Sequence, residues 1–238
     1  MLESLNLDHI LFLDIETVPA YPVYDKAPEK WQKLWDQKAK FFRDRNEEDT
    51  PASVYDRAGI YAEFGKIVCI SVGAIKKNGG FHLRSFADHD EKKLLADFAA
   101  LLHERYNGPL HRLCAHNGKE FDYPYIARRM VVHGIKLPQL LDITGKKPWE
   151  INLLDTMEMW KFGDYKSYTS ISLLAALFDI PTPKDDINGS QVYGVYYNEN
   201  DLARIVVYCQ KDVLTVAQLL RRYRGEPLIP EELVTIST

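Results

Sequence analysis

The stretch HILFLDIET, residues 9–17, gives the clearest indication of the fold. Residues 9–15 are apolar on both faces, a pattern typical of a strand that is buried on both sides. Asp14 and Glu16 are two residues apart on this strand, so both side chains leave the same face. We expect them at the carboxyl end of the strand, where the sites of sheet proteins gather.

Three more polar residues interrupt stretches that otherwise have the pattern of buried segments. Asp122 lies in HNGKEFDY, residues 116–123, and Tyr208 and Asp212 lie in YCQKDV, residues 208–213. Buried carboxylates are costly unless they are paired or bound to metal, and no basic residue recurs at a fixed spacing beside these acids. A divalent-metal site for phosphoryl transfer accounts for the whole set.

Each of these positions also has a plainer interpretation. Asp122 can cap the helix that it begins, although the face it shares with Ile126 and Met130 is expected to turn toward the sheet. The spacing Tyr-x-x-x-Asp occurs three times in the chain, and only Tyr208 and Asp212 lie in mid-helix beside a buried stripe. The match at Tyr208 and Asp212 is therefore the informative one.

Hydrophobic periodicity predicts an α/β architecture with a mixed sheet covered by helices. The expected strands are 9–15, 67–76, 81–87, 111–116 and 151–155, and the expected helices are 90–106, 121–133, 170–178 and 199–223. The run Asn78-Gly79-Gly80 predicts a hairpin between the second and third strands. An antiparallel meander that leads into two right-handed crossovers gives the mixed sheet.

A charged segment separates the first two strands. Within it, residues 28–45 place apolar side chains at helical spacing, which predicts a helix packed across an edge of the sheet. These side chains are Trp31, Leu34, Trp35 and either Ala39 or Phe42. No internal repeat or linker marks a boundary, so the expected organisation is a single domain over 1–238 with a helical insertion at about 20–60.

Composition bounds the function without deciding it. With 238 residues, 46% of them apolar, the chain is long enough for one core, and its net charge of −4 argues against a broadly basic nucleic-acid surface. Two divalent cations would still cancel four acids where a phosphate docks. The cysteines form neither a zinc pattern nor a disulfide framework, and no apolar run approaches the roughly 18 residues of a membrane span. We expect a cytoplasmic protein that does not bind a membrane.

The three acidic segments, taken together, resemble the motifs of a known family. LDIET, HNGKEFD and YCQKDV are similar to the three motifs of the DEDD superfamily of 3′→5′ exonucleases in its tyrosine subclass (DEDDy). More narrowly, the chain resembles the predicted exonucleases related to the proofreading domain of family-B DNA polymerases. YAEFGKIVCISVG, GKKPWE and SLLAALFDIPTPKDDINGSQV extend the resemblance to nearly the whole chain, and Val207 stands where the histidine subclass has its histidine.

This resemblance implies a ribonuclease H-like fold with a five-stranded mixed sheet of order 3-2-1-4-5, flanked by helices. It also implies two divalent ions, Mg²⁺ or Mn²⁺, held by Asp14, Glu16, Asp122 and Asp212. Asp14 would bridge both ions, and Asp122 would steady the second. Glu16 and Asp212 would hold the ion beside the attacking water.

The resemblance gives Tyr208 and three further residues roles of their own. A phenol with a pKa of about 10 stays protonated near neutrality, so Tyr208 would orient the attacking water rather than accept its proton. Thr17, Asn117 and Phe121 are expected at the terminal nucleotide. Phe121 would either stack on the 3′ end or pack in the core.

The implied function is a metal-dependent 3′→5′ exonuclease that hydrolyses single-stranded DNA from its 3′ end by a two-metal mechanism. DNA is favoured over RNA by family analogy alone, and an exoribonuclease that trims RNA ends would use the same site. The alternative that is not an enzyme is a module that binds nucleic acid without hydrolysing it. Such a module would have little need for four acids and Tyr208. We recognise no polymerase domain in the sequence, so coupling to synthesis or repair would require a separate partner.

Overall fold

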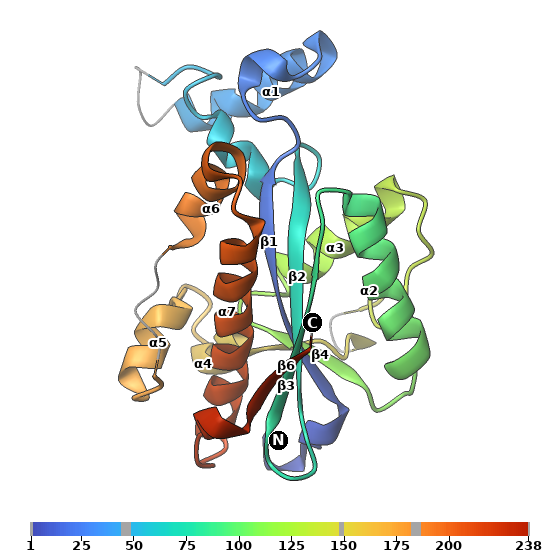
Figure 1. Cartoon of the computed structure of the whole chain (residues 1–238), viewed down its shortest axis with the longest axis vertical. Helices are drawn as coiled ribbons and strands as arrows, with labels where there is room; N and C mark the ends of the chain where they lie inside the picture. The colour runs from blue at the N-terminus through green and yellow to red at the C-terminus, as the bar shows by residue number, and fades with distance from the viewer. Residues whose placement is uncertain (1, 44–48, 148–149, 182–186, 238) are drawn as a thin grey trace.

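The computed structural model describes residues 2–43, 49–147, 150–181 and 187–237, and it has helices on both faces of one mixed sheet (Figure 1). The strands in these residues are β1 Ile10–Pro19, β2 Gly65–Ile75, β3 Phe81–Ala87, β4 Arg112–Ala115, β5 Leu154–Asp155 and β6 Val234–Ser237. Their order across the sheet is β5-β4-β1-β2-β3-β6. β1, β2 and β3 form an antiparallel meander, whereas β4, β5 and β6 pair in parallel with their neighbours.

The expectation of five strands in the order 3-2-1-4-5 is wrong, because β6 adds a sixth strand at the edge, beside β3. β6 runs parallel to β3, with Val234 opposite Phe81 and Ser237 opposite Arg84. Its β-branched residues favour extended backbone, but a strand of 4 residues is too short to give a periodic pattern. The five strands that the sequence predicts keep their expected relative order.

β1 is longer than its apolar pattern predicts, and this changes where the acids lie. It pairs with β2 along most of its length but with β4 only from Ile10 to Phe12, so its second half extends past β4. Asp14 and Glu16 therefore lie in the middle of β1, and the expectation that they end the strand is wrong. A register shift between Glu16 and Thr17 makes the β1–β2 ladder irregular beside them.

Helices divide between the two faces of the sheet: α2 and α3 cover one face, and α7 covers the other together with α4, α5 and α6 (Figure 1). Their bounds are α1 Glu29–Arg43, α2 Glu91–Arg105, α3 Asp122–Val132, α4 Thr156–Lys161, α5 Ile171–Leu177, α6 Val192–Gly194 and α7 Leu202–Tyr223, and a π-helical turn, Val195–Glu199, precedes α7. The predicted helices correspond to α2, α3, α5 and α7, whereas α4 and α6 are additional. No helix among these residues is long and apolar enough to cross a membrane.

Alternate residues of β1 face the two layers of helices. Leu11 and Leu13 pack in the cluster that includes α2 and α3, whereas Ile10 and Phe12 pack in the cluster that includes α7. This alternation continues through the polar part of the strand. Asp14 therefore faces α7.

The insertion after β1 is helical, as predicted, but its α-helix, α1, does not pack across an edge of the sheet as expected. α1 lies beyond the ends of β1 and β2, where Trp35 and Ala39 are buried in a cluster of their own (Figure 1). Leu34 is 39% exposed, so its expected packing is also wrong. The expected helix extends to residues 44–45, which lie outside the described residues, as does the side chain of Phe42.

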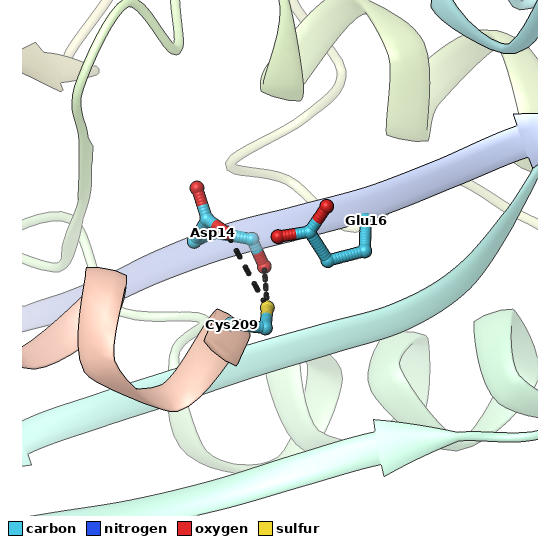
Figure 2. Close-up of side chains that lie close together, drawn as sticks. All are labelled: Asp14, Glu16 and Cys209. Carbon is cyan, nitrogen blue, oxygen red and sulfur yellow. Dashed lines mark hydrogen bonds between the residues drawn. The ribbon is translucent and has the colours of Figure 1, made fainter. Parts of the chain in front are cut away.

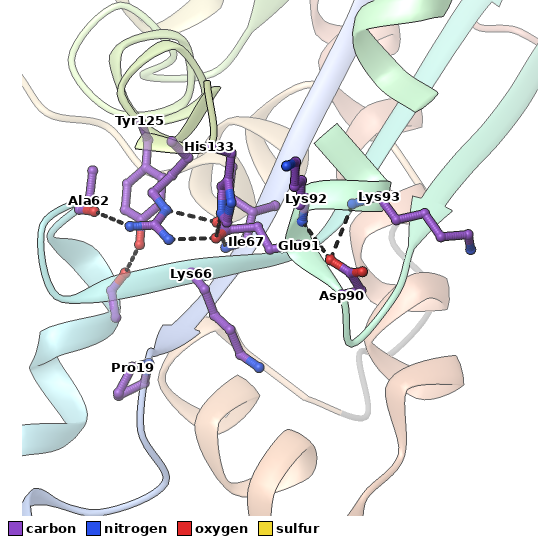
Figure 3. Close-up of polar contacts among 12 residues, drawn as sticks. Pro19, Ala62, Lys66, Ile67, Asp90, Glu91, Lys92, Lys93, Tyr125 and His133 are labelled. Atoms are coloured by element: carbon purple, nitrogen blue, oxygen red, sulfur yellow. Dashed lines mark hydrogen bonds and ion pairs between the residues drawn. The ribbon is translucent and has the colours of Figure 1, made fainter. Parts of the chain in front are cut away.

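One buried ion pair ties α2 to α3 and to the start of β2 (Figure 3). Glu91 is 6% exposed and accepts hydrogen bonds from Arg129 Nε at 2.9 Å and Nη2 at 2.5 Å, from the Ile67 N–H at 2.7 Å and from His133 Nε2 at 2.7 Å. Arg129 also donates to the Ala62 carbonyl at 2.9 Å. Burial alone would raise the pKa of Glu91, but the bonds from these donors outweigh it and hold that pKa below its usual value.

Candidate active site

Asp14 and Glu16 project from the same face of β1 toward α7, as their spacing predicts (Figure 2). The Glu16 carboxylate points toward that of Asp14, and Cys209 on α7 places its Sγ 3.4 Å from both the backbone carbonyl and Oδ2 of Asp14. Ligand atoms of these three residues lie within 4.8 Å of one another. Glu16 is 7% exposed and Asp14 is half-buried, so the two acids are held close together and only partly open to solvent.

α7 brings Tyr208 and Asp212 to these acids. The buried stripe of the helix, which includes Ile205, Cys209 and Val213, packs against β1 and β2, and Tyr208 and Asp212 lie beside that stripe, one turn apart. The Tyr208 hydroxyl donates a hydrogen bond to Asp212. Burial and the neighbouring carboxylates raise the pKa of Tyr208, so its phenol is a hydrogen-bond donor and not a base.

Asp122 begins α3 and reaches the part of β1 that extends past β4. Its carboxylate accepts hydrogen bonds from its own backbone N–H and from that of Ile15, so capping accounts for only part of its environment. Asp122 is 3% exposed, and its Oδ1 has no hydrogen-bond partner within the described part of the chain. An unsatisfied buried acceptor costs about 1–3 kcal/mol, and more when it is charged, which a bound cation would offset.

Crowding of the acids shifts their protonation. Burial, followed by the charges of Glu16, Asp212 and Asp122, raises the pKa of Asp14 well above its usual value. The pKa of Glu16 is also raised, first by burial and then by the charge of Asp212. Burial raises the pKa of Asp122 to about 7. Burial and mutual repulsion therefore favour the protonated forms of these carboxylates unless positive charge offsets the repulsion.

The three residues expected at the terminal nucleotide lie in different surroundings. Thr17 faces away from the acids, and its hydroxyl donates a hydrogen bond to the Tyr125 phenol oxygen on the α3 side. The ring of Phe121 lies 5.4 Å from that of Tyr125 and is half-buried against the core. Asn117 has a left-handed backbone conformation, φ 62°, and lines a cavity of about 460 Å³.

Asp155 organises the loop that carries Asn117, a role that the sequence does not reveal. It ends β5, is 3% exposed, and accepts the backbone N–H groups of Asn117 at 2.9 Å and Lys119 at 3.0 Å. It also accepts the Met157 N–H at 2.9 Å at the start of α4. Because Asn117 and Lys119 are 38 and 36 residues away along the chain, no local pattern indicates these contacts.

Comparison with known proteins identifies the family. Residues 60–224 match the family described as "Predicted 3'-5' exonuclease related to the exonuclease domain of PolB". The chain belongs to this family. The matched range of this predicted exonuclease contains Asp122, Tyr208 and Asp212, whereas Asp14 and Glu16 lie before it.

One of the solved structures that match the predicted exonuclease is the family B DNA polymerase from the hyperthermophilic archaeon Pyrobaculum calidifontis, with a TM-score of 0.49 and 16% sequence identity. The match covers 89% of this chain and 24% of that chain. The predicted exonuclease thus spans about a quarter of the polymerase's length. None of the curated proteins matches it.

The acids of the predicted exonuclease fit a divalent cation. Asp14 and Glu16 offer neighbouring oxygen ligands, and the charges of Asp122 and Asp212 reach both of them. The Oδ1 of Asp122, which has no hydrogen-bond partner among the described residues, adds a further buried oxygen. Burial raises the pKa of Cys209, so its thiol stays protonated and the available ligands are carboxylate oxygens. Such a ligand set suits Mg²⁺ or Mn²⁺.

Proposed function

We propose that this protein is a divalent-metal-dependent 3′→5′ exonuclease that removes nucleotides from the 3′ end of single-stranded DNA. The observation that carries the proposal is that carboxylates from β1, α3 and α7 lie close to one another and to a protonated tyrosine. One of their buried oxygens, Oδ1 of Asp122, has no hydrogen-bond partner in the part of the chain that the structure describes. Membership of a family of predicted 3′-5′ exonucleases supports the reaction. The relation of that family to a polymerase exonuclease domain favours DNA over RNA.

In this proposal Asp14, Glu16, Asp122 and Asp212 hold two cations, Mg²⁺ or Mn²⁺. When bound, two such ions activate water and stabilise the charge that develops during an in-line displacement at phosphorus. Tyr208 acts through its hydroxyl, which stays protonated and orients the attacking water by a hydrogen bond. Its raised pKa argues against a role as general base near neutrality.

The end of the strand would meet three residues near these acids. Thr17 contacts the terminal nucleotide through its backbone, because its hydroxyl is bound to Tyr125 on the other face of the sheet. Asn117 holds the 3′ end from the loop after β4, where it borders the cavity. Phe121 presents only the accessible part of a half-buried ring.

The test is to incubate the purified protein with 5′-labelled single-stranded DNA and RNA of the same sequence, with Mg²⁺, Mn²⁺ or a chelator. We expect a ladder of DNA products that shorten from the 3′ end one nucleotide at a time, and none with the chelator. Circular single-stranded DNA is the matched control and should stay intact, since it has no 3′ end. Faster shortening of the RNA would assign the site to RNA, and no product with either metal would contradict the proposal.

A further inference from the structure

The segment after α4 exposes aromatic side chains to an unusual degree. Phe162 is 87% exposed, Tyr165 is 89% exposed and Tyr168 is 61% exposed. Aromatic residues gathered on a surface commonly mark a binding site. Phe162 also adopts a left-handed backbone conformation, φ 44°, which is rare for a bulky residue.

Two of these rings border a cavity that adjoins the candidate active site. Tyr165 and Tyr168 line the cavity of about 460 Å³ that Asn117 also lines, whereas Phe162 does not line it. Asn117 belongs to the loop that leads from β4 into α3, and α3 begins at Asp122. The cavity therefore lies next to the loop that leads to Asp122, one of the acids of the candidate site.

Hydrogen bonds fix the position of Tyr168 relative to this loop. His116 Nε2 lies 3.0 Å from the Thr169 carbonyl, which can only accept, so Nε2 carries the proton. Burial lowers the pKa of His116, so the ring is neutral and its Nδ1 accepts from the Thr156 hydroxyl at 2.9 Å. The residue before Asn117 is thus bonded to the residue after Tyr168, which holds the aromatic segment against the loop.

Charged side chains around the cavity are largely paired with one another. Lys119 forms an ion pair with Glu158, and Lys161 Nζ lies 3.8 Å from a carboxylate oxygen of Glu120. Lys161 Nζ also lies 4.1 Å from the centroid of the Tyr168 ring. Because few charges remain free, the cavity suits flat aromatic groups better than a row of phosphates.

We propose that Tyr165 and Tyr168 form a stacking surface for the unpaired bases that lie 5′ of the terminal nucleotide. This inference rests on the proposed function, and it specifies the substrate as a strand whose bases are free to stack on protein. Every base has a flat aromatic face, so the surface would hold any sequence. Bases within a duplex are paired and stacked on each other, so they cannot use it without being unwound.

Binding measurements test the stacking surface without turnover. In the Asp14→Asn protein, whose substrate should stay intact, we would measure the Kd of a short fluorescent single-stranded oligonucleotide. Tyr165→Ala and Tyr168→Ala should each raise the Kd about five- to hundredfold, the range for the loss of one base–aromatic stack. Tyr165→Phe and Tyr168→Phe should bind nearly as the parent does. Phe162→Ala is the matched control, because it removes an equally exposed ring outside the cavity and should leave the Kd unchanged.

The outcomes separate this inference from the proposed function. Unchanged affinity in both alanine variants would overturn the stacking surface. A loss of affinity in Phe162→Ala or in Tyr165→Phe as large as that in the alanine variants would overturn it too. A blunt duplex should bind the parent and the alanine variants equally, and a selective loss of duplex binding would also overturn it. The p-nitrophenyl ester of thymidine 5′-monophosphate has no upstream nucleotide, so its hydrolysis by the wild-type protein reports on the acids alone. No hydrolysis of this ester or of DNA would contradict the proposed function, while the binding data would still decide on Tyr165 and Tyr168.

Discussion

At the scale of single residues, burial of like charges governs the candidate site. Asp14 and Glu16 lie in a strand with apolar neighbours, where burial and the charges of the neighbouring acids raise the pKa of each carboxylate. Cys209 supplies only a weak donor to Asp14, at 3.4 Å. Protons or cations can offset this repulsion, and the two compete for the same oxygens. Removal of one carboxylate should therefore affect metal binding, activity and stability together.

Asp14→Asn tests this reasoning at the residue that faces Glu16 and Cys209. We expect degradation of single-stranded DNA to fall at least about a thousandfold, because the charge stabilisation supplied by a bound metal is worth several kcal/mol and about 1.4 kcal/mol corresponds to a factor of ten. The melting temperature should stay the same or rise, since one of several repelling charges is lost. Asp25→Asn is the control, because Asp25 is an exposed acid away from the site, in the unrelated spacing Tyr21 to Asp25. Undiminished activity in Asp14→Asn would contradict the site.

Tyr208→Phe removes a hydroxyl while leaving the ring in place. We expect kcat to fall about a hundred- to a thousandfold, as for the loss of one positioned donor in a transition state. Metal affinity and DNA affinity, measured by titration in separate experiments, should change little. Tyr21→Phe, in the unrelated spacing at 21–25, is the control. A variant that loses metal binding but keeps its rate per bound metal would show that Tyr208 has a structural role.

At the scale of elements, the Glu91 network joins α2 to α3 and β2. Glu91→Gln leaves the Arg129 charge buried without its partner, so we expect the free energy of unfolding at pH 7 to fall by about 3–5 kcal/mol. Denaturant unfolding followed by circular dichroism measures the change. Asp88→Asn is the control, because it removes an exposed ion pair with Lys93, which should contribute little. Equal losses of unfolding free energy in both variants would show that the buried Glu91 pair contributes no more to stability than an exposed ion pair.

The same pair gives a prediction about acid stability. The pKa of Glu91 is lower in the folded protein than its unfolded value of about 4.3, so its contribution is fully present above that value. It is lost as the pH falls through the lower, folded pKa. The difference in stability between wild type and Glu91→Gln should therefore be constant near neutrality and shrink below about pH 4. A difference that stays constant down to about pH 2 would contradict a charge-dependent contribution.

Elements with a long periodic pattern could be predicted from the sequence, whereas short elements and contacts between elements could not. α2, α3 and α7 follow from their apolar stripes, and the acids of the site from the burial of the segments around them. β6 pairs with the edge of β3, which lies about 150 residues earlier in the chain, and the role of Asp155 depends on a loop far away in sequence. The contact of Cys209 with Asp14 joins residues 195 positions apart, so no spacing indicates it.

At the scale of the whole molecule, the site lies where β1 continues and β4 stops. β4 pairs with β1 only as far as Phe12, so β4 does not cover the edge of the β1 residues that follow. Asp122, at the start of α3, reaches this edge and accepts a hydrogen bond from the Ile15 N–H. α7 crosses the same region from one face of the sheet and brings Tyr208 and Asp212. Three elements far apart in sequence thus converge on one group of acids. The stability of the whole protein should therefore depend on whether that group is bound to cations.

Saturating Mg²⁺ or Mn²⁺ should raise the melting temperature, and more so at about pH 8 than at about pH 5.5. An acid with a raised folded pKa stabilises the fold below its unfolded pKa of about 4. That contribution is lost as the pH rises through the folded pKa, which is about 7 for Asp122. The metal-free protein should therefore lose stability between about pH 4 and pH 7, and cations that bind only the folded state should restore it.

At a hundredfold excess over Kd, a ligand adds about 2.7 kcal/mol, which for a chain of this length corresponds to a shift of about 5–10 °C. Melting curves with and without each metal, at several pH values, measure the shift. The shift should shrink as the pH falls, because protons displace the cations from the same carboxylates. Asp14→Asn should lose most of it, whereas the exposed control Asp25→Asn should keep it. Equal shifts in wild type and Asp14→Asn would place the bound ions elsewhere and remove the main physical support for a metal-dependent nuclease.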